Sequence, residues 1–192
     1  MVVNFGYLDR PCIGESVCGD AGCWRQHGRC VLALADGLGH GPAACHAAVS
    51  AMHCVAINQY QGCAEILAVC DRKLIDTRGA ALAIAVIDLE SGEMTLGSVG
   101  NIRVALVAKQ RIFRLEGGRG ILGAGYTWRQ PDKVQLDAWD VVVMFSDGVY
   151  ETADLRSCLG SLDVTMQELA ERILTRCGRV NDDAAVLTYQ YG

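Results

Sequence analysis

Short apolar runs, separated by glycines and polar residues, dominate the hydrophobic pattern of the chain. Residues 29–36 read Arg-Cys-Val-Leu-Ala-Leu-Ala-Asp, and this continuous apolar run predicts a strand buried on both faces. Residues 140–145 have no polar residue between their ends and predict another strand. Tight turns are expected at Ser91-Gly92 and Lys109-Gln110. Further strands are predicted at residues 80–89, 93–99, 103–108, 111–115, 133–136 and 184–189.

Three segments have the apolar spacing of helices. Residues 42–59 begin with Pro42, which suits the first turn of a helix, and they are rich in alanine. We expect Val49, Met52 and Ala56 to share the apolar face of this helix. Gly62 ends that segment, and residues 64–76 and about 165–177 carry apolar stripes that predict two more helices.

The order of these elements predicts the fold class. Strands and paired helices are segregated along the chain, which favours antiparallel sheets with helices packed outside them. The predicted class is α+β, in sandwich form. The chain has 192 residues, and it contains no linker-like segment and no repeat at a solenoid period. We therefore expect one domain over residues 1–192.

Charge and hydropathy exclude two classes of partner. The chain carries 17 basic and 22 acidic residues, which gives a formal net charge of −5. A nucleic-acid partner is disfavoured, because phosphate-backbone binding usually needs a basic excess. No apolar run approaches the roughly 20 residues that cross a bilayer, so we expect a soluble protein that does not act in the membrane.

Ten cysteines suggest two further classes, a secreted disulfide scaffold and a zinc protein. Their share, about 5%, is below the density of disulfide scaffolds. The N-terminus shows no basic region followed by an apolar stretch, so no signal peptide is expected. No C-x-x-C or H-E-x-x-H motif occurs. We interpret the cysteines as reduced packing residues, which predicts a cytoplasmic location.

The candidate chemistry lies in aspartates at strand ends. Apolar strands run into Asp36-Gly37 and into Asp147-Gly148, and an ionised carboxylate in such a place is costly without a cation. Asp20 follows Gly19, and Asp182-Asp183 precedes the last strand. Carboxylates without cysteine or histidine ligands suit Mg²⁺ or Mn²⁺. A single Asp-Gly, however, is more often a plain turn than a ligand.

Taken in order, these motifs resemble the SpoIIE-type metal-dependent serine/threonine phosphatases of the PPM superfamily. Within that family they are most similar to the short RsbX group, which is associated with the stressosome. The motifs are Gly19-Asp20, Ala35-Asp36-Gly37-Leu38-Gly39-His40-Gly41, Ser98-Val99-Gly100-Asn101, Phe145-Ser146-Asp147-Gly148-Val149 and Asp182-Asp183.

The resemblance implies a four-layer α-β-β-α sandwich, in which helix pairs flank two antiparallel sheets. It also implies two Mn²⁺ or Mg²⁺ ions at one end of the sheets. Asp36 would bridge the two ions and take part in activating a water, and Gly37 would offer its carbonyl to one ion. Asp20 would lie beside that same ion.

Other residues are assigned by the same resemblance. Asp147 and Asp182 would hold the second ion, and Asp183 would take a third site or support the ligands. Asn101 would orient a water or a substrate oxygen, although it also fits a plain turn. His40 is a candidate general acid, although a histidine at a helix N-terminus also fits a structural role.

The implied activity is hydrolysis of phosphoserine or phosphothreonine by a metal-activated water. The implied substrate is a phosphorylated STAS-domain protein of a bacterial stress-signalling complex of the stressosome type. Two alternatives stay open, a degenerate phosphatase fold that serves as a binding scaffold and a phosphohydrolase of small metabolites. The scaffold reading would be marked by loss of Asp36, Asp147 or Asp182, and none is lost. A thiol phosphatase is disfavoured, because its cysteine would have to lie in a loop that leads into a helix N-terminus, and the C-x₅-R spacing from Cys23 to Arg29 leads into a predicted strand.

Basic residues gather in one predicted hairpin. Residues 103–119 hold five basic side chains against one acidic residue, Glu116. Such a run either steers an acidic partner or forms the solvated face of a hairpin. The basic residues are Arg103, Lys109, Arg111, Arg114 and Arg119.

Overall fold

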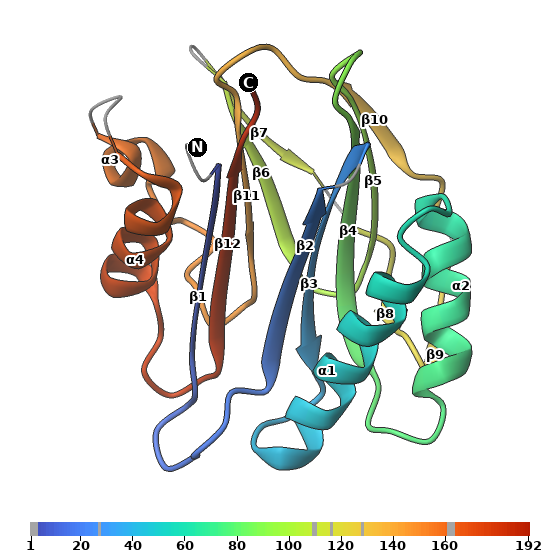
Figure 1. Cartoon of the computed structure of the whole chain (residues 1–192). Coiled ribbons are helices and arrows are strands. Elements are labelled where there is room, and N and C mark those ends of the chain that lie inside the picture. Colours follow the sequence, from blue (N-terminus) through green and yellow to red (C-terminus); the bar gives the residue numbers. More distant parts are fainter. Residues whose placement is uncertain (1–3, 27, 109–110, 116, 128, 161–163) are drawn as a thin grey trace.

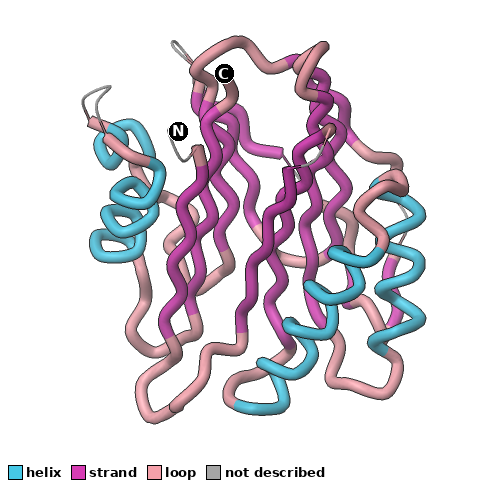
Figure 2. Tube along the Cα trace, viewed as in Figure 1, coloured by secondary structure: helices cyan, strands magenta, loops and turns pink. Residues whose placement is uncertain are grey.

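The computed structural model describes residues 4–26, 28–108, 111–115, 117–127, 129–160 and 164–192. In this part of the chain two five-stranded antiparallel sheets pack face to face, and helices cover the outer face of each (Figure 1; Figure 2). The predicted sandwich of antiparallel sheets with outer helices is therefore confirmed. The expected Lys109-Gln110 turn and Glu116 lie outside the described residues.

Sheet A has the strand order β1-β12-β11-β6-β7, and helices α3 and α4 lie on its outer face. Its elements are β1 (Phe5–Arg10), β6 (Arg103–Val107), β7 (Ile112–Leu115), β11 (Val141–Phe145), α3 (Leu155–Leu159), α4 (Met166–Cys177) and β12 (Ala184–Gln190).

Sheet B has the strand order β10-β5-β4-β3-β2, and helices α1 and α2 pack on its outer face. Its elements are β2 (Asp20–Gln26), β3 (Arg29–Gly37), α1 (Pro42–Ile57), α2 (Cys63–Leu74), β4 (Ala80–Asp88), β5 (Glu93–Val99) and β10 (Asp132–Gln135). A small hairpin of β8 (Gly120–Ile121) and β9 (Gly125–Tyr126) lies beside the start of β4, where Ala80 bridges Leu122.

The central strands are buried on both faces, as their unbroken apolar runs predict. On β3, Leu32 and Leu34 point into the core between the two sheets, whereas Val31 and Ala33 face α1 and α2. A third cluster fills the space between sheet A and α4. Each strand thus contributes alternate side chains to two layers of core.

The apolar face of α1 differs from the expectation. Val49 is 50% exposed, while Met52 is buried and Ala56 is half-buried. The helix packs through small residues, because its backbone comes very close to β3: a Cβ on Gly37 would lie 2.0 Å from the carbonyl oxygen of Ala44. The buried face is Ala44, Ala47, Ala48, Ala51, Met52, Cys54 and Val55.

Several elements were not predicted from the pattern, namely β1, β2, α3 and the β8–β9 hairpin. β1 and β2 are edge strands of the two sheets, and their half-buried positions break the apolar run that a central strand shows. Asp20 is the first residue of β2.

The ten cysteines are free thiols, and most of them are buried in the core. Burial raises the pKa of Cys23 and of Cys63 to about 11, which keeps both thiols protonated and unreactive near neutral pH. This agrees with their interpretation as packing residues. Within the described ranges, no helix has both the length and the apolar character that a bilayer crossing requires.

Candidate functional site

The sheet topology brings the five predicted aspartates to one end of the sandwich. Strands β3 and β11 end there, and β2 and β12 begin there, at the lower end in Figure 1. Asp36 lies next to the last residue of β3 and pairs directly with Asp20 across the β2–β3 ladder. Asp147 follows β11, and Asp182 and Asp183 precede β12.

Three of these carboxylates line a single small cavity of about 200 Å³, together with Asn101 and His40. Asn101 follows β5 and donates a hydrogen bond from Nδ2 to Oδ2 of Asp147, at 2.7 Å. The rest of the wall is backbone and apolar surface. The complete lining is Asp36, Leu38, Gly39, His40, Ala81, Asn101, Ile121, Asp147 and Asp182.

Asp20 and Asp183 do not line this cavity and are buried beside it, each at 4% exposure. The Ser146 hydroxyl donates to Oδ2 of Asp20 at 2.6 Å, and the Cys12 backbone N–H donates to Oδ1 of Asp183 at 2.8 Å. The second oxygen of each carboxylate is buried without a hydrogen-bond partner in the described part of the chain.

The carboxylates repel one another. Burial, and next the charge of Asp147, raise the pKa of Asp36 from its ordinary 3.8 to about 7, although the hydrogen bond from Asn101 opposes this. Burial and the charge of Asp36 raise the pKa of Asp20 well above its ordinary value. Burial and then Asp147 likewise raise the pKa of Asp182. Concentrated, partly desolvated negative charge of this kind is stabilised by a cation.

The donor set fits a hard divalent cation. Carboxylate oxygens surround the cavity, and the two orphaned oxygens of Asp20 and Asp183 lie beside it. Oxygen donors of this kind are the ligands of Mg²⁺ and Mn²⁺. Among the described residues, no three acidic, cysteine or histidine side chains already converge on one point at metal-binding geometry. Side chains with the right donor atoms for a divalent cation are thus gathered at this cavity, but they do not converge on a single coordination point.

The glycines that follow Asp36 and Asp147 are needed for close packing. A Cβ on Gly37 would meet the Ala44 carbonyl oxygen at 2.0 Å, and a Cβ on Gly148 would meet the Asp183 carbonyl oxygen at 1.9 Å. Both distances are far below van der Waals contact. A side chain at Gly37 would push the end of β3 away from α1, and one at Gly148 would push the segment of Asp147 away from that of Asp183.

His40 lies at the edge of the cavity, where its Nδ1 is 2.6 Å from Oε1 of Glu15. Glu15 belongs to the β1–β2 connection, and the pattern gave no sign of its role. Ser146 was also missed, although it lies within the Phe-Ser-Asp-Gly motif. Its hydroxyl joins Asp20 to β12 by accepting the Ala185 N–H at 2.9 Å, and only the fold brings these groups together.

Ser146→Ala should lower the free energy of unfolding by about 1–3 kcal/mol, because it leaves the buried Ala185 N–H and Asp20 without their partner. Urea unfolding of the metal-free protein measures the change. Ser50→Ala, on α1, is the control and should change little. An unchanged midpoint in Ser146→Ala would show that water replaces the hydroxyl.

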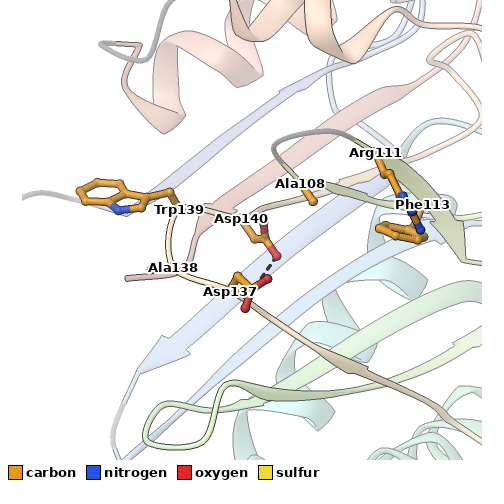
Figure 3. Close-up of a pocket in the computed structure, with 7 residues that line it drawn as sticks. All are labelled: Ala108, Arg111, Phe113, Asp137, Ala138, Trp139 and Asp140. Atoms are coloured by element: carbon orange, nitrogen blue, oxygen red, sulfur yellow. Dashed lines mark hydrogen bonds between the residues drawn. The ribbon is translucent and has the colours of Figure 1, made fainter.

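Two larger hollows lie at the opposite end of sheet A, and they lack the acidic cluster. One, of about 670 Å³, is lined by Arg111, Phe113, Asp137 and Asp140, with Trp139 at its margin (Figure 3). Asp140 accepts the Asp137 backbone N–H at 3.0 Å. The other hollow, of about 650 Å³, shares Ala108 and Trp139 with it. Size therefore does not identify the chemical site.

Comparison with known proteins decides the family. Residues 26–191 match the family model described as Stage II sporulation protein E (SpoIIE). The chain belongs to the SpoIIE family. This confirms the family predicted from the sequence motifs, and the match spans the chain from β3 to β12, with Asp36, His40, Asn101, Asp147, Asp182 and Asp183 of the candidate site.

The SpoIIE-family chain is also similar to individual proteins. It is 31% identical over 94 residues to the phosphoserine phosphatase RsbX of Bacillus subtilis (strain 168), a match that covers 48% of this chain. The chain thus spans about half the length, 47%, of the curated relative it matches.

Solved structures of relatives share the fold of the SpoIIE-family chain. A chain from a study described as "The bacterial stressosome: a modular system that has been adapted to control secondary messenger signaling" matches with a TM-score of 0.91 and 33% identity, over 97% of this chain and 98% of that one. RsbX in complex with magnesium matches with a TM-score of 0.85 and 22% identity, over 97% and 94%. These matches confirm the predicted four-layer sandwich of PPM phosphatases.

Proposed function

We propose that this chain is a metal-dependent protein serine/threonine phosphatase that hydrolyses phosphoserine or phosphothreonine. The observation that carries the proposal is the convergence of Asp36, Asp147 and Asp182 on one small cavity, where burial and then mutual repulsion raise the pKa of Asp36. The similarity to the phosphoserine phosphatase RsbX supports the same reaction. The proposal treats residues 1–192 as one catalytic domain.

The proposal assigns two ions, Mn²⁺ or Mg²⁺, to this end of the sheets. The ions would be held by Asp36 and the Gly37 carbonyl, with Asp20, Asp147 and Asp182. Asp183 would support the cluster through its free Oδ2. When bound, such ions lower the pKa of a water and screen the phosphoryl oxygens, so that no protein nucleophile is needed. The relative solved with magnesium supports a divalent cation.

The other residues of the site position these groups and handle protons. Asn101 holds the Asp147 carboxylate in place through its 2.7 Å hydrogen bond. Glu15 fixes the His40 ring at Nδ1, so Nε2 is the atom from which His40 can give a proton to the departing serine oxygen. His40 is 65% exposed, as expected of a group that must exchange protons with water.

The dimensions of the cavity favour a protein substrate over a small metabolite. Pockets that enclose small molecules typically hold about 300–1,000 Å³, whereas this cavity holds about 200 Å³. It has room for a phosphoryl group and little more of the substrate. The rest of the substrate must then lie on the surface outside it, as a phosphoprotein would.

We further propose that the substrate is a phosphorylated STAS-domain protein of a cytoplasmic stress-signalling complex. Support comes from the two relatives, one a phosphoserine phosphatase and the other solved in a study of the bacterial stressosome. The scaffold alternative is disfavoured, because a binding module has no use for clustered carboxylates that destabilise its fold without a cation.

Hydrolysis of a phosphoserine peptide should depend on added metal. With Mn²⁺ or Mg²⁺ the protein should release phosphate, and excess chelator should lower the rate by about 10³-fold. Hydrolysis of an aryl phosphate by the same samples is the parallel measurement. Equal rates with metal and with chelator would contradict the metal-dependent mechanism. Metal-dependent hydrolysis of the aryl ester alone would contradict the phosphoprotein assignment and favour a small-molecule phosphohydrolase.

A further inference from the structure

A second hollow adjoins the carboxylate cavity and has the opposite charge. It holds about 310 Å³, and its charged side chains are Arg103, Arg114 and Glu151. Gly100 and Gly117 leave the backbone bare along part of its wall. We call this hollow the arginine groove.

The strand register explains how the arginine groove forms. Arg103 pairs with Phe145 across β6 and β11, and Arg114 pairs with Ala105 across β7 and β6. Ala105 and Phe145 belong to the core on the outer face of sheet A, so the two arginines lie on that same face. The basic run of the sequence is therefore not one uniform solvated surface. Arg103 and Arg114 share this groove, while Arg111 lines the hollow at the opposite end.

The groove and the cavity are neighbours along two chain segments. Gly100 lines the groove and the next residue, Asn101, lines the cavity. Phe145 lines the groove, and Asp147 lies in the cavity two residues later. The hydrogen bond between Asn101 and Asp147 thus lies where the two hollows meet. An extended peptide with its phosphoserine in the cavity can continue directly into the groove.

The arginines are only loosely held within the protein. Nε of Arg103 is 3.4 Å from Oε1 of Glu151, and Nη2 of Arg114 donates to the Glu151 backbone oxygen at 3.2 Å. Both side chains of the ion pair are exposed, at 41% and 63%, so water screens this contact. Only Arg103 contacts the Glu151 carboxylate, and the groove holds two guanidinium groups against this one carboxylate, which leaves it with a net positive charge.

We propose that the arginine groove binds an acidic residue next to the phosphoserine of the substrate, which extends the proposed phosphatase function to a class of target sequence. Guanidinium groups match carboxylates through paired N–H donors, and the groove offers two such groups beside the cavity. The Glu151 carboxylate lies against Arg103, where the substrate carboxylate would bind, so Glu151 competes with the substrate for the guanidinium group.

The test compares a phosphoserine peptide flanked by aspartates with its counterpart flanked by asparagines, using the full chain with Mn²⁺. The ratio of kcat/KM for the acidic over the neutral peptide should be about 5–10 in the wild type. It should fall to about 1 in the double variant Arg103→Ala/Arg114→Ala. Glu151→Gln should raise the ratio by about twofold, because the competitor is removed. Arg72→Ala, an exposed cation at the end of α2, should keep the wild-type ratio.

Several outcomes would overturn the proposal. One is a wild-type ratio of kcat/KM near 1. Another is a double variant in which kcat/KM falls equally for the acidic and the neutral peptide, since a purely structural role of the arginines leaves the ratio unchanged. Fluorescence anisotropy with the unphosphorylated peptides separates this proposal from the phosphatase assignment. A preference for the acidic peptide that the double variant loses supports the groove even where no hydrolysis occurs. If the wild type shows no such preference, the proposal that the arginine groove binds an acidic residue is refuted.

Discussion

Asp36→Asn should abolish phosphatase activity and at the same time make the metal-free protein more stable. The activity should fall by about 10³-fold or more, because a carboxylate proposed to hold the ions is replaced by a neutral amide. The stability should rise because Asp36 is half-buried beside Asp147 and Asp182, and ionising it costs free energy. The two effects have opposite signs, which a general loss of folding cannot produce.

The stability effect of Asp36 has a defined pH window. The pKa of Asp36 is raised in the folded state from 3.8 to about 7, so the folded protein binds the proton more tightly than the unfolded chain. Metal-free wild type should therefore lose stability as the pH rises from about 4 to 7, and Asp36→Asn should lose less. At pH 8 the variant should be about 1–3 kcal/mol more stable.

Thermal unfolding with excess chelator and phosphate release with Mn²⁺ measure the two effects of Asp36→Asn. Asp76→Asn, an exposed carboxylate before β4, is the matched control and should change neither quantity. Near-normal turnover in Asp36→Asn would show that Asp36 is not a ligand of the metal ions. A variant that is less stable than the wild type at pH 8 would show that the carboxylate makes favourable contacts that outweigh the repulsion.

Gly148→Ala should destabilise the protein by about 3 kcal/mol or more and inactivate it. The new methyl group would lie 1.9 Å from the backbone oxygen of Asp183, and backbone atoms cannot rotate away as a side chain can. The segment that carries Asp147 must then move away from the segment that carries Asp182. The spacing of the carboxylates changes, and with it the affinity for metal.

Urea unfolding and Mn²⁺ titration of the activity measure the two effects of Gly148→Ala. Gly62→Ala is the control, because its Cβ would meet only the Glu65 carboxylate, at 2.5 Å, and that side chain can swing aside. This control should cost less than about 1 kcal/mol. Wild-type stability and metal affinity in Gly148→Ala would show that the close approach to Asp183 does not set the geometry of the site.

How far the sequence could predict the site is clearest at Asp36 and Asp147. Each follows an apolar run and precedes a glycine, so the pattern alone marks a carboxylate at the end of a buried strand. Such a carboxylate needs a cation or hydrogen bonds to offset its burial in any fold, so neighbouring residues along the chain are enough to recognise it. Ser146 and Glu15 are different. Their partners, Asp20 and His40, lie 126 and 25 positions away, and no local pattern encodes contacts over those separations.

The sequence by itself determined the central strands, the three long helices, the segregated α+β class and the family to which the motifs belong. All of these follow from apolar periodicity and from residues that are neighbours along the chain. The tertiary structure alone decided the edge strands β1 and β2, the pairing of Asp20 with Asp36 and the small-residue face of α1. It also divided the basic run between two ends of the molecule, with Arg103 and Arg114 beside the acidic cavity. Register and close backbone approach fix these features, because they depend on which strands meet, and the order of residues along any one strand does not contain that information.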